Sequence, residues 1–126
     1  TVYNSCSARD FIRYDNNASF SGIKPVITID HCTLVGVSDD ASKRLLYIRF
    51  AGNSISFTNN IVANSNCIFS NQKSTATPTF KNNNYFKAPG LFTGGSTTGF
   101  KDASKYDFTV SNETIIDKAI GDPRWR

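Results

Sequence analysis

Apolar and polar residues alternate along this chain in short runs, and each run ends in a small or polar pair. The clearest runs are residues 27–32, 55–60 and 78–83, in which an apolar residue lies three positions before Cys32, Asn60 or Asn83. A more degenerate copy opens the chain and ends at Cys6. The steps between these four closing residues are 26, 28 and 23 residues. Self-similarity at such a period is the sequence signature of a solenoid.

Each repeat holds three short stretches whose period-two alternation predicts strands. A polar two-residue turn is expected between the first and second strands, at Asp30-His31, Asn59-Asn60 and Asn82-Asn83, with Asn4-Ser5 as the degenerate copy. The expected strands are residues 26–29, 32–35 and 45–50, then 54–57, 61–63 and 67–69, then 79–80, 84–86 and 91–92.

Asn at one turn of successive coils has a physical reason. Its side chain tolerates the left-handed backbone conformation and bonds to its own backbone, and stacked amides can bond to one another along the axis. We therefore expect a ladder formed by Asn59, Asn60, Asn82 and Asn83. Cys6 and Cys32 occupy equal slots of successive repeats and are expected to stack as buried free thiols. A disulfide between these two coils is the alternative.

Three strands per coil and an Asn-rich turn resemble the right-handed parallel β-helix of pectate-lyase-like proteins. The resemblance covers residues 1 to about 94, and it implies an all-β, single-stranded, right-handed parallel β-helix closed by a cap at residues 95–126 in the same domain. Residues 106–110, 115–117 and Gly121 are similar to the closing segment of many such helices. The Ser-Pro-Ala that typically precedes Ile-Asp there is replaced by residues 112–114.

The ending at residues 122–125 resembles that of β-helical surface proteins, often lipoproteins, of Bacteroidetes-type gut anaerobes. This resemblance implies an extracytoplasmic location, on the outer-membrane surface or in the periplasm. Because the chain opens in mid-repeat and a solenoid needs capped ends, we expect a C-terminal piece of a longer protein. We also expect it to act as a monomer.

Charge and composition narrow the function classes. The net charge is +4 at pH 7, but Lys and Arg are scattered, whereas a nucleic-acid binder usually clusters them in a stripe with a recognisable fold motif. No stretch approaches the roughly 20 apolar residues of a membrane-spanning helix. The three Cys and single His lack the paired spacing of a zinc site. We therefore expect no nucleic acid, transmembrane segment or metal in this chain.

One pattern predicts a binding surface. Residues 11–14 and 47–50 both read aromatic-Ile-Arg-aromatic, and residues 67–69 continue the series. Strand side chains alternate, and neighbouring strands lie about 4.8 Å apart. If Ile12, Ile48 and Ile68 point inward, an outward stripe results, formed by Phe11, Arg13, Tyr47, Arg49 and Phe69. Arg binds carboxylates in a bidentate manner, so the stripe suits an acidic polysaccharide. A solvated sheet face is the alternative.

No catalytic residue is expected. Lyases of the resembled fold hold calcium with clustered Asp residues and use a positioned Arg or Lys as the base. Here Asp39-Asp40 and Lys43-Arg44 lie in one loop, but calcium takes six to eight oxygen ligands, and no carboxylate recurs at one slot of successive coils. His31 has no partner pattern of a hydrolase triad. No cofactor is therefore predicted, and calcium enters only under a lyase interpretation.

The sequence thus favours a non-catalytic, surface-exposed β-helical module associated with acidic polysaccharide. This interpretation rests on fold analogy and on the Arg and aromatic stripe. Two alternatives stay open. The chain can be part of a pectate-lyase-like polysaccharide lyase whose catalytic residues lie upstream, or it can be a structural or adhesive spacer.

Overall fold

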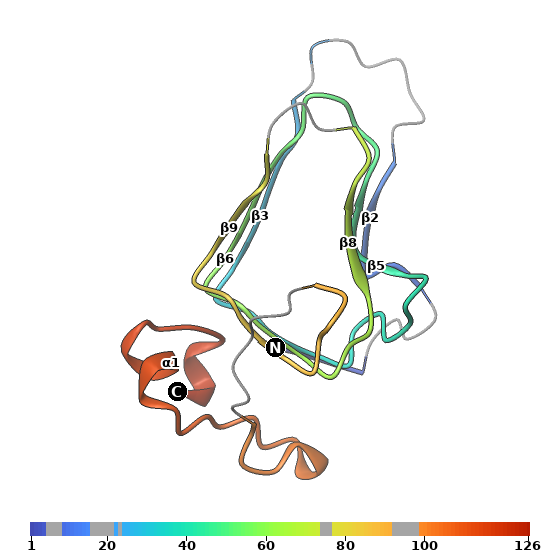
Figure 1. Cartoon of the computed structure of the whole chain (residues 1–126). Coiled ribbons are helices and arrows are strands. Elements are labelled where there is room, and N and C mark those ends of the chain that lie inside the picture. Colours follow the sequence, from blue (N-terminus) through green and yellow to red (C-terminus); the bar gives the residue numbers. More distant parts are fainter. Residues whose placement is uncertain (5–8, 16–21, 23, 74–76, 92–98) are drawn as a thin grey trace.

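The computed structural model describes residues 1–4, 9–15, 22, 24–73, 77–91 and 99–126. In these residues the chain is all-β except for short helical segments in its tail, and its strands form three parallel sheets. The chain visits sheets A, B and C in turn and then returns to sheet A (Figure 1). We call a segment that contributes one strand to each sheet a coil. The all-β, parallel class expected from the sequence is confirmed.

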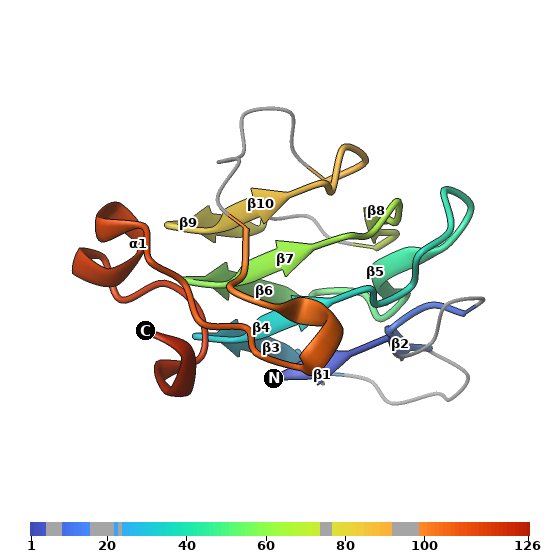
Figure 2. The same ribbon diagram turned by 90° about the horizontal axis from the view of Figure 1, so that it is seen from below.

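Successive coils stack strand upon strand in each sheet (Figure 2). Sheet A contains β1 (Val2–Tyr3), β4 (Thr33–Val35), β7 (Ile61–Ala63) and β10 (Asn84–Phe86). Sheet B contains β2 (Ile12–Tyr14), β5 (Arg44–Ile48) and β8 (Ile68–Asn71). Sheet C contains β3 (Val26–Asp30), β6 (Ser54–Thr58) and β9 (Thr79–Lys81).

The predicted strands agree with these elements to within one or two residues, with one exception. No strand forms at Leu91, which lies in a turn, and Phe92 lies outside the described residues.

The core lies between the three sheets. In β3 and β6 every second residue points inward, so Ile55 and Phe57 are buried while Ser54 is exposed. They join a cluster that includes Leu34, Leu46 and Ile48, and fully burying each such side chain contributes about 1.5–3 kcal/mol. Sheet A differs, because every residue of β4 and β7 is buried. A strand buried on both faces needs a cover on its outer side.

The tail supplies that cover. It contains η1 (Ala103–Lys105), α1 (Glu113–Asp117) and η2 (Pro123–Trp125), and it lies against the outer side of sheet A (Figures 1 and 2). A second apolar cluster joins the two parts, formed by Val35, Ile61 and Ala63 from the sheet and by Phe108, Val110, Ile115 and Ile120 from the tail. No helix in the described part of the chain is long and apolar enough to span a membrane.

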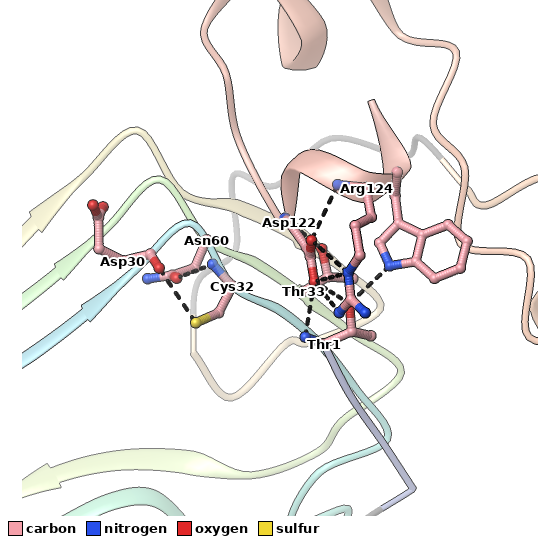
Figure 3. Close-up of polar contacts among 8 residues, drawn as sticks. Thr1, Asp30, Cys32, Thr33, Asn60, Asp122 and Arg124 are labelled. Atoms are coloured by element: carbon pink, nitrogen blue, oxygen red, sulfur yellow. Dashed lines mark hydrogen bonds and ion pairs between the residues drawn. The ribbon is translucent and has the colours of Figure 1, made fainter.

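The Asn residues between sheets C and A form a ladder whose inner column binds backbone groups. Figure 3 shows the contact between Asn60 and Cys32. The Asn60 Oδ1 accepts from the Cys32 N–H at 2.9 Å, and the Asn60 Nδ2 donates to the Ile29 carbonyl at 3.0 Å. Asn83 repeats this one coil later, accepting from the Asn60 N–H at 2.9 Å and donating to the Phe57 carbonyl at 2.8 Å. Each amide therefore satisfies one donor and one acceptor of the coil before it.

The outer column of the ladder bonds side chain to side chain. Asn59 Nδ2 donates to Asp30 Oδ1 at 2.8 Å, and Asn82 Nδ2 donates to Asn59 Oδ1 at 3.3 Å. His31, Asn59 and Asn82 share the left-handed conformation, with φ of 50°, 54° and 54°. Because Asp30 pairs with Thr58, the turn equivalent to Asn59-Asn60 is His31-Cys32, one residue later than predicted.

The opening segment was assigned to the wrong strand. Val2 pairs with Leu34, so residues 1–4 belong to sheet A beside β4 and do not align with β3. The left-handed Asn4 shares its turn with Gly36, Asn64 and Lys87. A short apolar run followed by a left-handed residue ends the strands of both sheets, so this pattern alone does not distinguish them.

The cysteines that the structure describes differ in how deeply they are buried. The predicted stacking of Cys6 on Cys32 involves a residue outside those that the structure describes. Cys32 is half-buried, and its thiol donates to the Asp30 carbonyl. Burial raises the pKa of this thiol. Cys67 is fully buried, and both are free thiols.

A second amide pair, at the corner between sheets B and C, was missed by the sequence analysis. Asn53 Nδ2 donates to Asn71 Oδ1 at 3.0 Å, and Asn71 Nδ2 donates back to Asn53 Oδ1 at 2.8 Å. Asn53 also donates to the Phe50 carbonyl. The two residues are not equivalent in the repeat, so no period in the sequence pointed to them.

Asp122 fastens the tail to the sheets (Figure 3). Its carboxylate accepts from the Thr1 nitrogen at 2.9 Å and from the Arg124 Nε, while its own N–H donates to Thr33 Oγ1 at 2.9 Å. The preceding Gly121 lies so close to the sheet that an added Cβ would come within 2.6 Å of Ile61. Hydrogen bonds from Arg124 and Thr1 hold the pKa of the Asp122 carboxyl far below its usual range.

The ladder predicts a stability difference between two Asn residues of the same coil. Asn60→Ala should lower the free energy of unfolding by about 1–3 kcal/mol, because the Cys32 N–H and the Ile29 carbonyl would lose their buried partner. Asn66→Ala should cost much less, since Asn66 is exposed and bonds to Asp39 at the surface. Urea denaturation of both variants measures this, and equally small losses would contradict a stabilising ladder.

The Asp122 contacts predict a pH-dependent loss of stability. At pH 7, Asp122→Asn should lower the free energy of unfolding by about 1–3 kcal/mol, because an ionised hydrogen-bond acceptor is lost. A depressed folded pKa contributes stability above the unfolded value of about 3.9 and loses it as pH falls towards the folded value. The gap between variant and wild type should therefore narrow between about pH 4 and pH 2.

Asp117→Asn is the matched control, since Asp117 is exposed on α1 and the change should stay within about 0.5 kcal/mol. Urea titrations at pH 2, 4 and 7 give the comparison. A gap between Asp122→Asn and wild type that is constant over this range would refute the role given to the ionised carboxylate.

Candidate functional site

The outer side of sheet B carries a cluster that we call the arginine face, formed by Asp10, Arg13, Asp15, Arg44, Tyr47 and Arg49. Alternation places Arg13, Tyr47 and Arg49 on this side, because Ile12 and Ile48 turn inward to the core. An irregularity of β5 between Arg44 and Tyr47 brings Arg44 to the same side. The parallel register places Arg13 of β2 beside Tyr47 of β5.

Tyr47 lies between two guanidinium groups. The Arg44 Cζ is 4.3 Å from the centroid of the Tyr47 ring, and the Arg13 Cζ is 5.1 Å from it. Both distances lie within the range of attraction between a cation and an aromatic ring. The half-buried ring therefore orients two positive charges on the outer surface.

Two carboxylates hold the arginines from the other side. Asp15 Oδ2 accepts from the Arg13 Nε at 2.6 Å, and Asp15 Oδ1 lies 3.1 Å from an Arg49 Nη. Asp10 Oδ1 accepts from the backbone N–H of Arg44 at 2.9 Å and lies 3.2 Å from its Nε.

These ion pairs shift the pKa values of the charged groups on the arginine face. The hydrogen bond from Arg13 lowers the pKa of Asp15, and Asp15 in turn raises the pKa of Arg13. With three Arg and two Asp, the face retains an excess of positive charge.

Arg13 and Arg49 are brought together, but not in the way the sequence predicted. Arg13 pairs with Tyr47, two positions before Arg49, so the two arginines do not form one column. Their guanidiniums meet instead at Asp15. A column of two Arg at strand spacing would place like charges about 4.8 Å apart, at a cost of about 1–3 kcal/mol at a protein surface.

Two residues of the predicted stripe lie elsewhere. Phe69 packs on the core and makes an edge contact with Phe80 at 4.8 Å between centroids, while Ile68 is the outward residue of the pair. Ile48 pairs with Asn71, three positions after Ile68, and this odd offset reverses the faces expected for β8. Phe11 also packs against the core. Neither ring belongs to the arginine face.

Phe69 instead lines a cavity of about 390 Å³ between the sheets at the β9 end. Its walls are mainly apolar and include Phe57, Phe80 and Leu91, with Lys81 at the rim. Tyr85 also borders it, and burial raises the pKa of Tyr85 to about 12. These walls continue the hydrophobic core, and their chemistry does not match a polar polysaccharide.

The remaining polar candidates have structural partners. His31 Nδ1 lies 2.7 Å from Asp30 Oδ2, while Asp30 Oδ1 accepts from Thr58 and Asn59 in the ladder. Asp39 Oδ1 accepts from the backbone and side chain of Asn66. Asp40 accepts in the same way from Ser42. Among the described residues, no group of three or more His, Cys, Asp or Glu is placed to hold a metal ion.

Comparison with known proteins gives one match. The family model of a domain of unknown function, DUF5123, matches residues 27–125. The match includes the ladder, the tail, and Arg44, Tyr47 and Arg49 of the arginine face, and it begins after Asp10, Arg13 and Asp15. No significant match was found among curated proteins or among solved structures.

Proposed function

The chain belongs to the DUF5123 family of domains of unknown function, and we propose that it is a non-catalytic β-helical module that associates with acidic polysaccharide. The finer fold proposed is a right-handed parallel β-helix similar to that of pectate-lyase-like proteins. Three parallel sheets, each with strands from successive coils, support this fold. The Asn ladder at the corner between sheets C and A supports it as well.

The arginine face is the observation that carries the proposed function. Guanidinium groups recognise carboxylates through paired, charge-assisted hydrogen bonds. Here two of them, from Arg13 and Arg44, lie over the ring of Tyr47, and a third, from Arg49, pairs with Asp15 on the same face. Tyr47 is the aromatic residue of the predicted stripe that lies on this face, where its ring contacts Arg13 and Arg44, because Phe69 faces the core. A uronic acid polymer presents a carboxylate on each sugar, which is the group that such a face can bind.

A non-catalytic role fits the state of the other polar groups. Asp39 and Asp40, the carboxylates considered for a lyase, bond within their own loop and to Asn66. We propose that the module acts without a cofactor and as a monomer in an extracytoplasmic location. The location rests on the resemblance of residues 122–125 to β-helical surface proteins.

A double substitution tests the proposal. Arg13→Ala with Arg49→Ala should weaken binding to oligogalacturonate by about 1–3 kcal/mol, the scale of two charge-assisted contacts reduced by solvent screening. Binding of wild type should also weaken as salt rises. Isothermal titration at two salt concentrations, with a neutral glucan in parallel, gives the measurement.

Lys101→Ala with Lys105→Ala is the matched control, because it removes two exposed cations that pair with Asp107 and Asp102 in the tail. This control should bind like wild type. Equal binding by the Arg variant, or no binding of oligogalacturonate by wild type, would leave the arginine face as a solvated surface and favour a structural spacer.

A further inference from the structure

We infer that the Asp15 carboxylate occupies the carboxylate site of the arginine face, and that an acidic polysaccharide binds there by displacing it. This inference rests on the proposed function and deepens it. It makes Asp15 the residue that sets both the affinity and the selectivity of the face.

The geometry around Asp15 is that of a bound carboxylate. Its two oxygens are divided between two guanidiniums, with Oδ2 2.6 Å from Arg13 Nε and Oδ1 3.1 Å from an Arg49 Nη. The guanidiniums come from different coils, so they converge on a point above the sheet. A uronate carboxylate has the same shape and charge as the Asp15 side chain.

Asp10 shows what a permanently held carboxylate looks like on the same face. Its side chain is 8% exposed and accepts from the backbone N–H of Arg44 as well as pairing with the guanidinium. Asp15 is 33% exposed, and its contacts with the described residues are the two side chains of Arg13 and Arg49. Asp10 is therefore part of the scaffold, whereas Asp15 can leave without breaking a bond to the backbone.

The exposure of the two Arg–Asp15 ion pairs sets how strongly Asp15 competes with a bound carboxylate. Arg13 and Arg49 are about half exposed, and exposed ion pairs contribute about 0.2–1 kcal/mol each. Two of them would reduce the affinity of a competing carboxylate roughly 2- to 30-fold. A neutral sugar cannot replace the lost charge pairing, so Asp15 discriminates against it.

The test compares Asp15→Asn with wild type in titrations with oligogalacturonate at low salt. The variant should bind roughly 2- to 30-fold more tightly. The gain should vanish when Asp15→Asn is combined with Arg13→Ala and Arg49→Ala, since the guanidiniums that it frees are then absent. Asp117→Asn makes the same change in net charge on α1, away from sheet B, and should change affinity less than twofold.

The outcomes separate this inference from the proposed function. If wild type binds and Asp15→Asn binds equally or more weakly, displacement is wrong while polysaccharide association stands. A gain equal to that of Asp117→Asn would also overturn the inference, because net charge alone would explain it. If neither wild type nor Asp15→Asn binds, both proposals fail. Binding by Asp15→Asn alone would support displacement and show that Asp15 closes the face in wild type.

Discussion

The amide ladder between sheets C and A is the constraint on which the rest of the structure depends. Neighbouring coils are linked at this corner by a buried side chain that bonds to two backbone groups of the coil before it, as Asn60 does with Cys32 and Ile29. A slip of one residue would turn every side chain to the other face, and it would also break both of these bonds. The ladder therefore fixes the register of sheet C, and the loops elsewhere in the coil are free to differ in length.

Because the ladder positions are fixed and the loop lengths are not, the repeat could be recognised in the sequence, but part of its alignment was wrong. The steps of 28 and 23 residues differ because the segments between the ladder positions differ in length, yet Cys32, Asn60 and Asn83 share one slot as the sequence predicted. The alternation of apolar and polar residues predicted the positions of the strands, because each strand must bury one face in the core. The pattern did not separate the left-handed turn after sheet C from the one after sheet A, and this is why residues 1–4 were aligned with the wrong strand.

The candidate site was harder to predict than the fold for an electrostatic reason. Matching of residues 11–14 with 47–50 by similarity placed Arg13 beside Arg49, but similarity between strands does not determine register when no ladder fixes it. In sheet B the observed register sets Arg13 beside Tyr47 and lets Asp15 meet Arg49. Attraction replaces the repulsion of a like-charge column. Phe69 turns inward because Ile48 pairs with Asn71 and not with Ile68, an offset of three positions that similarity between the two segments does not reveal.

The two sides of the molecule thus serve different purposes. The outer side of sheet A is covered by the tail, with Asp122 fastened to Thr1 and Thr33 and with Ile115 and Ile120 in an apolar cluster. Among the described residues, the outer side of sheet B has no such apolar cover, and its two carboxylates pair with its three arginines and leave a net positive charge. A face of that kind keeps its shape without a ligand, because Tyr47 and Asp10 hold Arg44 in place. Its remaining pairs involve half-exposed side chains and can be exchanged at low cost. Preorganised cations beside an exchangeable carboxylate are the physical basis for selective recognition of an acidic polymer.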